Sequence, residues 1–488
     1  MNSTTLRPSG AGAAVGFLVV MEFGSGILQG WLSPLFSTIG QQYGVSAASL
    51  NWVSAAYLLA TVLVVPLLSK LGDIYGHKKV LFIATIVVAL SSVLVAFAPN
   101  YGLFLLGRAI QAPLAVFLPL EFAIVHQRDP ENAGRSIGRL VGALTLGAAV
   151  GGLLSGVVLD ATGSLSATLM VPALFMLLCV IGVKVFVTET ELRTQSKVDY
   201  LGALLLGGGL VLFLGGLSNM ATLSPVIAAT AMIVGLALLL GWVVSARKVE
   251  QPLIDLRVLL KGGIGLPIVV AFLYGAQMFG SQSPTSVYLR SDPGAQGFGF
   301  GATATVAGLV LSLMAAASFV GAAFSDRVAR ATSGPRAVTL GGVVSAAGYA
   351  LMILVPASLP VFTVWLVICG LGAGVVIGAL PTIVVKRADP DAVGIASGLY
   401  NTARTAAGAV SGALFALLMA ALADKGTGGA STSTATGFHA VWWICAALCV
   451  TFAVVAMFIR DEPGQPAEQE SVSPAATGRD DAQLVGEN

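Results

Sequence analysis

The sequence predicts an all-α integral membrane protein with fourteen transmembrane helices, and three observations support this fold class. Hydrophobic residues make up 56% of the 488-residue chain and charged residues only 10%, whereas soluble domains carry about 25% charged residues. The chain divides into apolar runs of bilayer-spanning length, and its basic residues alternate between the two sides of those runs. A soluble protein, a disordered chain and a transmembrane β-barrel are therefore excluded.

The apolar runs define the predicted spans. The hydrocarbon core of a bilayer is about 30 Å thick, so a helix that crosses it needs roughly 20 apolar residues. Charges and Pro, Gly or Asn turns interrupt the apolar sequence between fourteen such runs, which are 13–36, 51–70, 80–98, 102–126, 138–159, 166–187, 200–219, 224–245, 263–289, 303–324, 338–356, 360–385, 392–423 and 438–459.

The basic residues predict how these spans are oriented. With a cytoplasmic N-terminus, all but four of the 25 Lys and Arg residues fall in predicted inner loops and tails. The exceptions are Arg290 and Lys425 in predicted outer loops, and Arg108 and Arg404 inside or at the edge of predicted helices. This asymmetry predicts a multi-pass protein of the inner (plasma) membrane with both termini in the cytoplasm.

A charged motif occurs twice in the chain. The loop predicted between the second and third spans reads Ser69-Lys-Leu-Gly-Asp73-Ile-Tyr-Gly76-His77-Lys78-Lys79, and a degraded copy after the tenth span reads Gly321-Ala-Ala-Phe-Ser-Asp326-Arg327. Each copy places an acid just past a predicted helix end and basic residues before the next helix. Asp73 is placed to accept backbone N–H bonds at a helix start or to pair with nearby Lys and Arg, and Gly76 permits a tight reversal.

The repeated motif indicates two parallel repeats within the chain. We therefore predict two six-helix bundles related by pseudo-symmetry, with two extra helices between them. The predicted parts are a cytoplasmic N-terminus (1–12), an N-terminal bundle (13–197), two inserted helices with a cytoplasmic linker (198–260), a C-terminal bundle (261–460) and a disordered cytoplasmic tail (461–488).

These motifs are similar to those of the major facilitator superfamily, over residues 13 to 460. The run at Asp73 resembles the family signature G-x-L-a-D-r-x-G-r-k, and Arg108-Ala-Ile-Gln111 resembles its R-x-x-Q-G motif. The fourteen spans look like those of the drug:proton antiporter group. The resemblance implies a conformational gate at the charged motif, its copy and their partners, to which we assign Asp73, Gly76, Lys78, Lys79, Asp326, Arg327 and Arg404.

One departure of the fifth span, which reads Ala143-Leu-Thr-Leu-Gly147-Ala148-Ala-Val-Gly151-Gly152, from the antiporter pattern G-x-x-x-G-P-x-x-G-G matters. Gly147, Gly151 and Gly152 match this pattern, but Ala148 stands where proline is expected. The glycines flatten one helical face and predict close packing against a second helix. The missing proline removes a built-in kink, so antiport rests less firmly on this motif than the family resemblance alone implies.

Ionisable residues inside the membrane are functional candidates, because an ionised side chain there costs a few kcal/mol or more. Glu22 lies near the middle of the first span. The resemblance implies that Glu22 faces the substrate path, where it would bind a proton and a cationic substrate in alternation. Arg108 is expected to have Glu22 as its partner, either for proton transfer, as the resemblance implies, or as a structural ion pair.

Two further charges allow two interpretations each. Glu121 either lines the inner cavity or pairs with Lys78 or Lys79 as a gate latch, and Arg404 either serves the gate or reaches to the inner interface. The second bundle contains no acid near the midplane, and its polar cavity candidates are Tyr274, Gln277 and Asn401. A mostly apolar site of this kind suits bulky amphipathic compounds better than sugars.

The sequence contains no nucleophile with a base, no phosphate-binding glycine loop and no cluster of metal ligands, so no enzyme, cofactor or metal is predicted. The predicted function is secondary active export of small amphipathic or hydrophobic compounds, such as drugs, antibiotics or related metabolites, in exchange for protons. The predicted partners are a small-molecule substrate, protons and the lipid bilayer; a net charge of +2 indicates no nucleic acid, and the protein is expected to be a monomer.

Two other functions remain open at this point. A facilitator or proton symporter for a polar metabolite is compatible with Ala148 in the fifth span. A non-transporting receptor or scaffold would need large extramembrane domains, for which no predicted loop is long enough.

Overall fold

The computed structural model describes residues 11–128, 133–189, 199–218, 220, 224–249, 252, 263–355, 358–387, 393–425, 431–432 and 434–460. The predicted tail 461–488, most of the predicted N-terminus 1–12 and most of residues 250–260, at the end of the predicted inserted part 198–260, lie outside these residues. Helices make up nearly all of the described chain, and its strands are β1 (Asp424–Lys425) and β2 (Ser431–Thr432), which pair antiparallel. The prediction of an all-helical membrane protein is confirmed.

Thirteen helical segments of the described residues are long and apolar enough to cross a membrane. The remaining predicted span, 263–289, forms two shorter helices, α12 (Gly265–Gly280) and α13 (Gln282–Arg290). The 16 residues of α12 are fewer than the roughly 20 that a crossing needs, and α13 begins with polar residues. The count of fourteen crossings therefore stays a prediction.

The first half of the described chain forms one set of packed helices, which we call the first group. In it α1 packs on α7, α4 packs on α8, and α3 packs on α5. Its helices are α1 (Ala11–Trp31), η1 (Ser33–Leu35), α2 (Phe36–Tyr43), α3 (Ala47–Tyr75), α4 (His77–Ala96), α5 (Tyr101–Ile110), η2 (Ala112–Val116), α6 (Phe117–Arg128), α7 (Ala133–Thr162) and α8 (Leu165–Phe186).

Two predicted spans of this group are not single α-helices. The span predicted over 13–36 is interrupted by the 3₁₀ helix η1 and then continues as α2 to Tyr43, and the span predicted over 102–126 is interrupted by η2. Pro34 and Pro113 stand in the first turns of η1 and η2. A proline lacks the backbone N–H that would continue an α-helix, which explains both corrections.

The second half of the described chain forms the second group of helices. Here α15 packs on α17, α16 packs on α17 and α19, and α12 packs on α18. Besides α12 and α13, its helices are α14 (Pro293–Gln296), α15 (Ala304–Ala331), α16 (Gly334–Leu354), α17 (Leu359–Arg387), α18 (Val393–Ala421) and α19 (Ala435–Met457).

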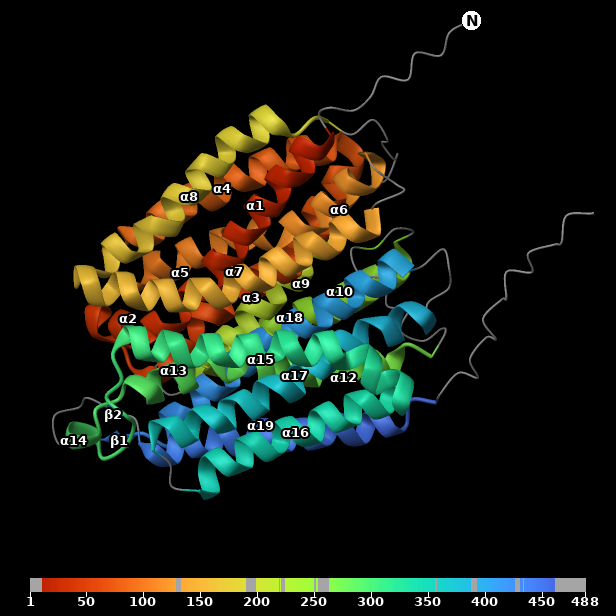
Figure 1. Cartoon of the computed structure of the whole chain (residues 1–488). Helices are drawn as coiled ribbons and strands as arrows, with labels where there is room; N and C mark the ends of the chain where they lie inside the picture. Colours follow the sequence, from red (N-terminus) through yellow and green to blue (C-terminus); the bar gives the residue numbers. More distant parts are fainter. Residues whose placement is uncertain are drawn as a thin grey trace, which may run out of the picture.

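The two groups meet along two helix pairs, α7 with α15 and α3 with α18. The helices run roughly side by side, with α2, α14, β1 and β2 at one end of the molecule (Figure 1). We call this the Asp160 end, and the opposite end, where α3 is followed by α4, the Asp73 end. The charge distribution predicts that the Asp160 end is extracytoplasmic.

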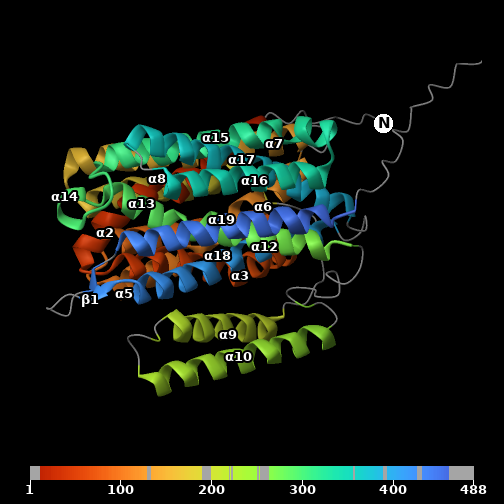
Figure 2. The ribbon, with the colours of Figure 1, turned by 90° about the horizontal axis from the view of Figure 1, so that it is seen from below.

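The inserted helices form a separate pair. α9 (Tyr200–Ser218) and α10 (Pro225–Lys248) pack against each other, and α9 also contacts α3 and α18. Figure 2 shows the pair lying alongside the remaining helices. Most of the surface of α10 is exposed and apolar, as expected of a helix that faces lipid.

Several helices are longer than the predicted spans. α3 continues to Tyr75 and α15 continues to Ala331, so Asp73, Asp326 and Arg327 lie within the last turns of helices. The prediction that these residues lie in loops beyond the helix ends is therefore wrong. Hydropathy marks only the part of a helix inside the hydrocarbon core, and both helices extend past it into the polar region.

Candidate functional site

Two buried carboxyl groups lie inside the first group of helices. Glu22 of α1 is 1% exposed, and Glu121 of α6 is completely buried. None of their four carboxyl oxygens makes a well-formed hydrogen bond to a described residue, and the Ser25 side chain, three residues along α1, is the polar group that acts on Glu22. α1 packs against α6, and Glu22 is the charged group that acts on Glu121. The two acids therefore lie close enough to interact, and among the described residues no basic side chain forms an ion pair with either of them.

Arg108 lies at the end of α5, where the helix gives way to η2. Its Nη1 donates to Gln111 Oε1, its Nε donates to the Val53 carbonyl oxygen at 3.4 Å, and its guanidinium carbon lies 4.9 Å from the centre of the Tyr57 ring. Gln111 Nε2 in turn donates to Ser92 Oγ at 2.8 Å. Arg108 is thus held by α3 and by Gln111 of its own segment, and Gln111 links it to α4.

The expected ion pair between Arg108 and Glu22 is absent from the part of the chain that the structure describes. Tyr57 is close enough to both residues to be affected by their charges. The carbonyl, amide and ring contacts of Arg108 satisfy its guanidinium without a carboxylate, which is the physical reason for this correction.

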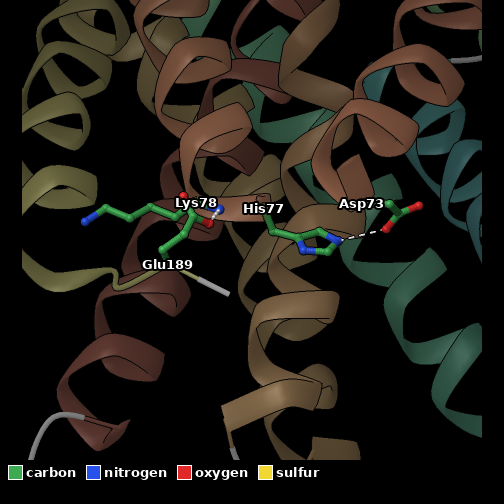
Figure 3. A network of polar contacts seen from close by, with 4 residues as sticks. All are labelled: Asp73, His77, Lys78 and Glu189. Atoms are coloured by element: carbon green, nitrogen blue, oxygen red, sulfur yellow. Dashed lines mark hydrogen bonds and ion pairs between the residues drawn. The ribbon is translucent and has the colours of Figure 1, made fainter. Parts of the chain in front are cut away.

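Glu121 is not the partner of Lys78 or Lys79. The backbone N–H groups of these two lysines donate to the carboxylate of Glu189, at 3.0 and 3.1 Å (Figure 3). Glu189 follows α8 and therefore caps the start of α4 from a segment more than 100 residues away. Because Glu121 is completely buried and lies beside Glu22, its place is the helix interior rather than a latch at the Asp73 end.

The charged motif has a different hydrogen-bonding pattern from the one that we predicted. Asp73 Oδ1 contacts His77 Nε2 at 3.0 Å, whereas the N–H groups at the helix start go to Glu189 (Figure 3). Gly76 has a φ of 103°, and a Cβ at this position would overlap the Glu189 carboxylate. Glycine is required here both by the backbone conformation and by the close approach of Glu189.

The degraded copy of the motif lies on the surface of α15. Asp326 and Arg327 are exposed, the Arg327 guanidinium carbon lies 4.9 Å from the centre of the Phe324 ring, and Arg330 Nε donates to the Asp326 carbonyl oxygen. Within the described residues, no hydrogen bond or ion pair joins the two copies of the motif.

Arg404 lies in the interior of α18, eleven residues after Val393, where the helix begins. Its Nη2 donates to Asn401 Oδ1 at 3.0 Å, and its guanidinium carbon lies 5.7 and 6.0 Å from the ring centres of Tyr400 and Phe279. The structure therefore brings together Arg404 and Asn401, two of the predicted site residues, but it does not bring Arg404 to Asp73.

The predicted polar residues of the second group are largely hydrogen-bonded. Tyr274 OH donates to the Ala373 carbonyl oxygen at 3.3 Å. Gln277 Nε2 donates to Tyr349 OH at 2.6 Å, and Tyr349 OH donates to Ser281 Oγ at 2.9 Å. Gln277 Oε1 is the one atom of this chain of contacts that has no partner among the described residues.

The glycines of the fifth span lie at two helix contacts. A Cβ on Gly147 or Gly151 would overlap the backbone of α1 at Phe23 or Ile27, and Gly152 faces α15, where a Cβ on Gly308 would overlap the Gly152 carbonyl oxygen. α7 runs without interruption from Ala133 to Thr162, as expected where Ala148 replaces proline.

Sequence reasoning missed three residues that these contacts single out: Tyr57 beside Arg108, Glu189 at the start of α4, and Asp160, which is described below. The bond of Arg108 to Gln111 could also have been predicted, because the spacing Arg-x-x-Gln places both side chains on one helical face. Glu189 carried no such local signal.

The fold agrees with the comparisons to known proteins. At the level of solved structures, the chain resembles a nucleoside transporter, NupG (TM-score 0.66, 17% identity, covering 91% of this chain and 99% of that one). It also resembles a POT family peptide transporter, PepTSo (TM-score 0.65, 14% identity, covering 91% of this chain and 97% of that one). At such identities the likeness concerns the fold alone.

Sequence relatives cover most of the chain as well. A probable actinorhodin transporter of Streptomyces coelicolor is 26% identical and covers 87% of this chain and 76% of its own length. The puromycin resistance protein pur8 of Streptomyces alboniger is 26% identical and covers 90% of each chain. The model of the Major Facilitator Superfamily matches residues 18–412. This chain therefore belongs to the major facilitator superfamily, and it is a multi-pass membrane transporter rather than an enzyme.

Proposed function

We propose that this transporter exports small amphipathic or hydrophobic compounds, such as drugs, antibiotics or related metabolites, in exchange for protons by alternating access. The observation that carries the proposal is the pair Glu22 and Glu121, two buried carboxyls without hydrogen-bond partners among the described residues. The names of relatives as a probable actinorhodin transporter and a puromycin resistance protein support the substrate class.

The buried acids explain how protons would be coupled to transport. An ionised carboxylate that is buried without donors or a counter-charge is costly, so in this conformation the pair holds protons. When the path to Glu22 opens to water or to a cationic substrate, the same carboxyls lose their protons at little cost. Proton release and substrate binding then compete at one place, which couples the two flows in opposite directions.

The proposed architecture follows the predicted topology. The first bundle (13–197) and the second bundle (261–460) move relative to each other, and the inserted segment (198–260) connects them. The protein acts as a monomer in the plasma membrane with both termini in the cytoplasm. Arg108, Tyr274, Gln277, Asn401 and Arg404 contribute to the path between the bundles. The Tyr57 ring lies against the Arg108 guanidinium and is also reached by the charge of Glu22, which supports a positioning role for Arg108 near Glu22.

Transport in proteoliposomes with an imposed pH gradient tests this proposal. Radiolabelled puromycin and the lipophilic cation ethidium serve as probes, and we expect gradient-driven movement of at least one of them. Glu22→Gln should abolish the dependence on the gradient, Glu22→Asp should retain part of it, and Asp292→Asn, which removes an exposed carboxylate in a predicted outer loop, should change nothing. Movement that ignores the gradient, or that Glu22→Gln leaves unchanged, would contradict the proposed coupling.

One feature favours a second candidate, a facilitator or proton symporter for a polar metabolite. Ala148 replaces the proline of the antiporter motif, and α7 is a continuous helix. Inward accumulation of a labelled nucleoside or dipeptide by cells that produce the protein, together with no efflux of puromycin or ethidium, would establish this alternative.

A further inference from the structure

A carboxylate of the first group caps a helix of the second group at the Asp160 end. Asp160, near the end of α7, accepts hydrogen bonds from the backbone N–H groups of Ala304 at 3.2 Å and Thr305 at 2.8 Å. These are the first residues of α15, whose third N–H, that of Val306, is bonded to the side chain of Thr303. Asp160 therefore supplies acceptors that α15 lacks in its own segment.

Other contacts hold the two groups together at the same end. Arg290 Nη1 of α13 donates to the Pro34 carbonyl oxygen at 3.0 Å and to Thr38 Oγ1 at 2.7 Å. Nearer the middle of the same two helices, Ser312 Oγ of α15 donates to the Ala149 carbonyl oxygen of α7 at 2.6 Å. A Cβ on Gly156 would overlap the backbone of α15 at Ala304. The groups are thus in direct backbone contact around Asp160.

Asp73 occupies the equivalent position at the opposite end. It lies two residues before the end of α3, as Asp160 lies two residues before the end of α7. α3 packs on α18 of the second group, as α7 packs on α15. Both carboxylates are exposed, but Asp73 contacts His77 on the next helix of its own group. At this end the carboxylate is engaged within one group, whereas at the other end it bridges both.

From this contrast we propose that Asp160 is a latch for the predicted outer end of the transporter. It holds the N-terminus of α15 while that end is closed and releases it when the end opens, in alternation with Asp73 at the opposite end. The structure is the state with the Asp160 latch engaged. The inference rests on alternating access, which is part of the proposed function, but not on the substrate or on protons.

The energetics suit a reversible device. A carboxylate at a helix N-terminus contributes a modest free energy, because water replaces it when the contact opens. Loss of this contact corresponds to a change of about fivefold in the ratio of two conformations, enough to shift a population without locking the protein. A buried ion pair in the same place would be much harder to open.

Distances between spin labels in the purified full-length protein test the latch without any substrate or gradient. Ala161→Cys with Gln296→Cys reports on the Asp160 end, and Arg139→Cys with Arg330→Cys reports on the other end of α7 and α15; all four residues are exposed. The four native cysteines are buried, and the chain without added cysteines measures their background labelling.

We expect Asp160→Asn to lower the ratio of closed to open molecules at the Asp160 end about fivefold and to shorten the distances at the opposite end. Asp160→Glu should restore most of the closed population. Asp292→Asn is the matched control, because Asp292 caps α14 within its own segment, bonding Gly294 N at 2.9 Å; it should leave both distances unchanged.

Unchanged distances in Asp160→Asn would overturn the inference, as would the same shift in Asp292→Asn. Misfolding is distinguished from latch opening because it broadens both distance distributions, whereas opening lengthens one and shortens the other. If Asp160→Asn misfolds, the comparison of Asp160→Glu with the unsubstituted chain decides, since a purely structural role predicts no reciprocal change at the Asp73 end. Failure of proton-driven export in proteoliposomes would leave these distances unaffected, so the two proposals fail separately.

Discussion

In the first group of helices, α1 and α7 touch backbone to backbone at Gly147, and in the second group α12 and α18 touch in the same way at Gly275. The two groups differ in their buried carboxyl groups. The first contains Glu22 and Glu121 without hydrogen-bond partners among the described residues, whereas the second buries Tyr274 with its hydroxyl bonded. The comparison teaches that a close backbone contact occurs in both groups, whereas the unpartnered buried carboxyls of the described residues lie in the first group alone.

A substitution at the shared backbone contacts should have the largest effect. Gly147→Ala and Gly275→Ala each place a methyl group where a backbone carbonyl of the facing helix lies, so we expect a loss of about 3 kcal/mol in either group. Thermal unfolding of the purified protein in detergent measures this loss. Gly142→Ala is the control on α7, because no atom lies within 4 Å of its added Cβ. A loss in only one group would show that the scaffolds are not equivalent.

Replacement of the buried acids should increase the stability of the protein, whereas the glycine substitutions reduce it. Glu22→Leu and Glu121→Leu replace unpartnered polar groups by apolar ones, so each should stabilise the protein by about 1–2 kcal/mol while gradient-driven transport is lost. Unfolding temperature and transport are measured on the same preparations. Gln277→Leu is the comparison in the second group: it removes the hydrogen bond to Tyr349, and no stabilisation is expected. Equal gains at all three positions would remove the distinction between the groups.

The smallest effect is expected at the surface of the Asp73 end. Glu189→Gln weakens the cap on the N–H groups of Lys78 and Lys79 and should cost about 0.5–1 kcal/mol. Hydrogen exchange of the first turn of α4 reads out this change locally. Asp326→Asn, in the corresponding segment of the second group, should leave exchange and stability unchanged because Asp326 is exposed. Faster exchange in both variants would mean that the two motif copies are equally important for helix capping.

Hydropathy was sufficient to predict the helices because the bilayer imposes both length and composition on each one. It did not predict the breaks at Pro34 and Pro113 or the extension of α3 to Tyr75, since a window of apolar residues is insensitive to a missing backbone N–H and to the polar end of a helix.

The candidate site was predictable only where it depends on local spacing. Glu22 and Glu121 were recognised as acids within apolar runs, and their burial follows from that position. The bonds of Asp160 to α15 and of Glu189 to α4 join residues separated by 144 and 110 positions or more in the sequence. No pattern within one helix encodes such contacts, because they depend on which helices the fold places side by side.

The inserted helix α9 has a consequence for the route of a lipid-soluble compound. α9 contacts both α3 and α18, the pair along which the two groups meet on that side, and Leu63 of α3 lies directly against Gly207 of α9 (Figure 2). At the α3–α18 seam, a molecule dissolved in the bilayer therefore contacts the inserted helix α9 before it reaches α3 and α18. The inserted pair makes the transporter asymmetric toward lipid, because α9 covers the α3–α18 seam, whereas neither α9 nor α10 packs on α7 or α15.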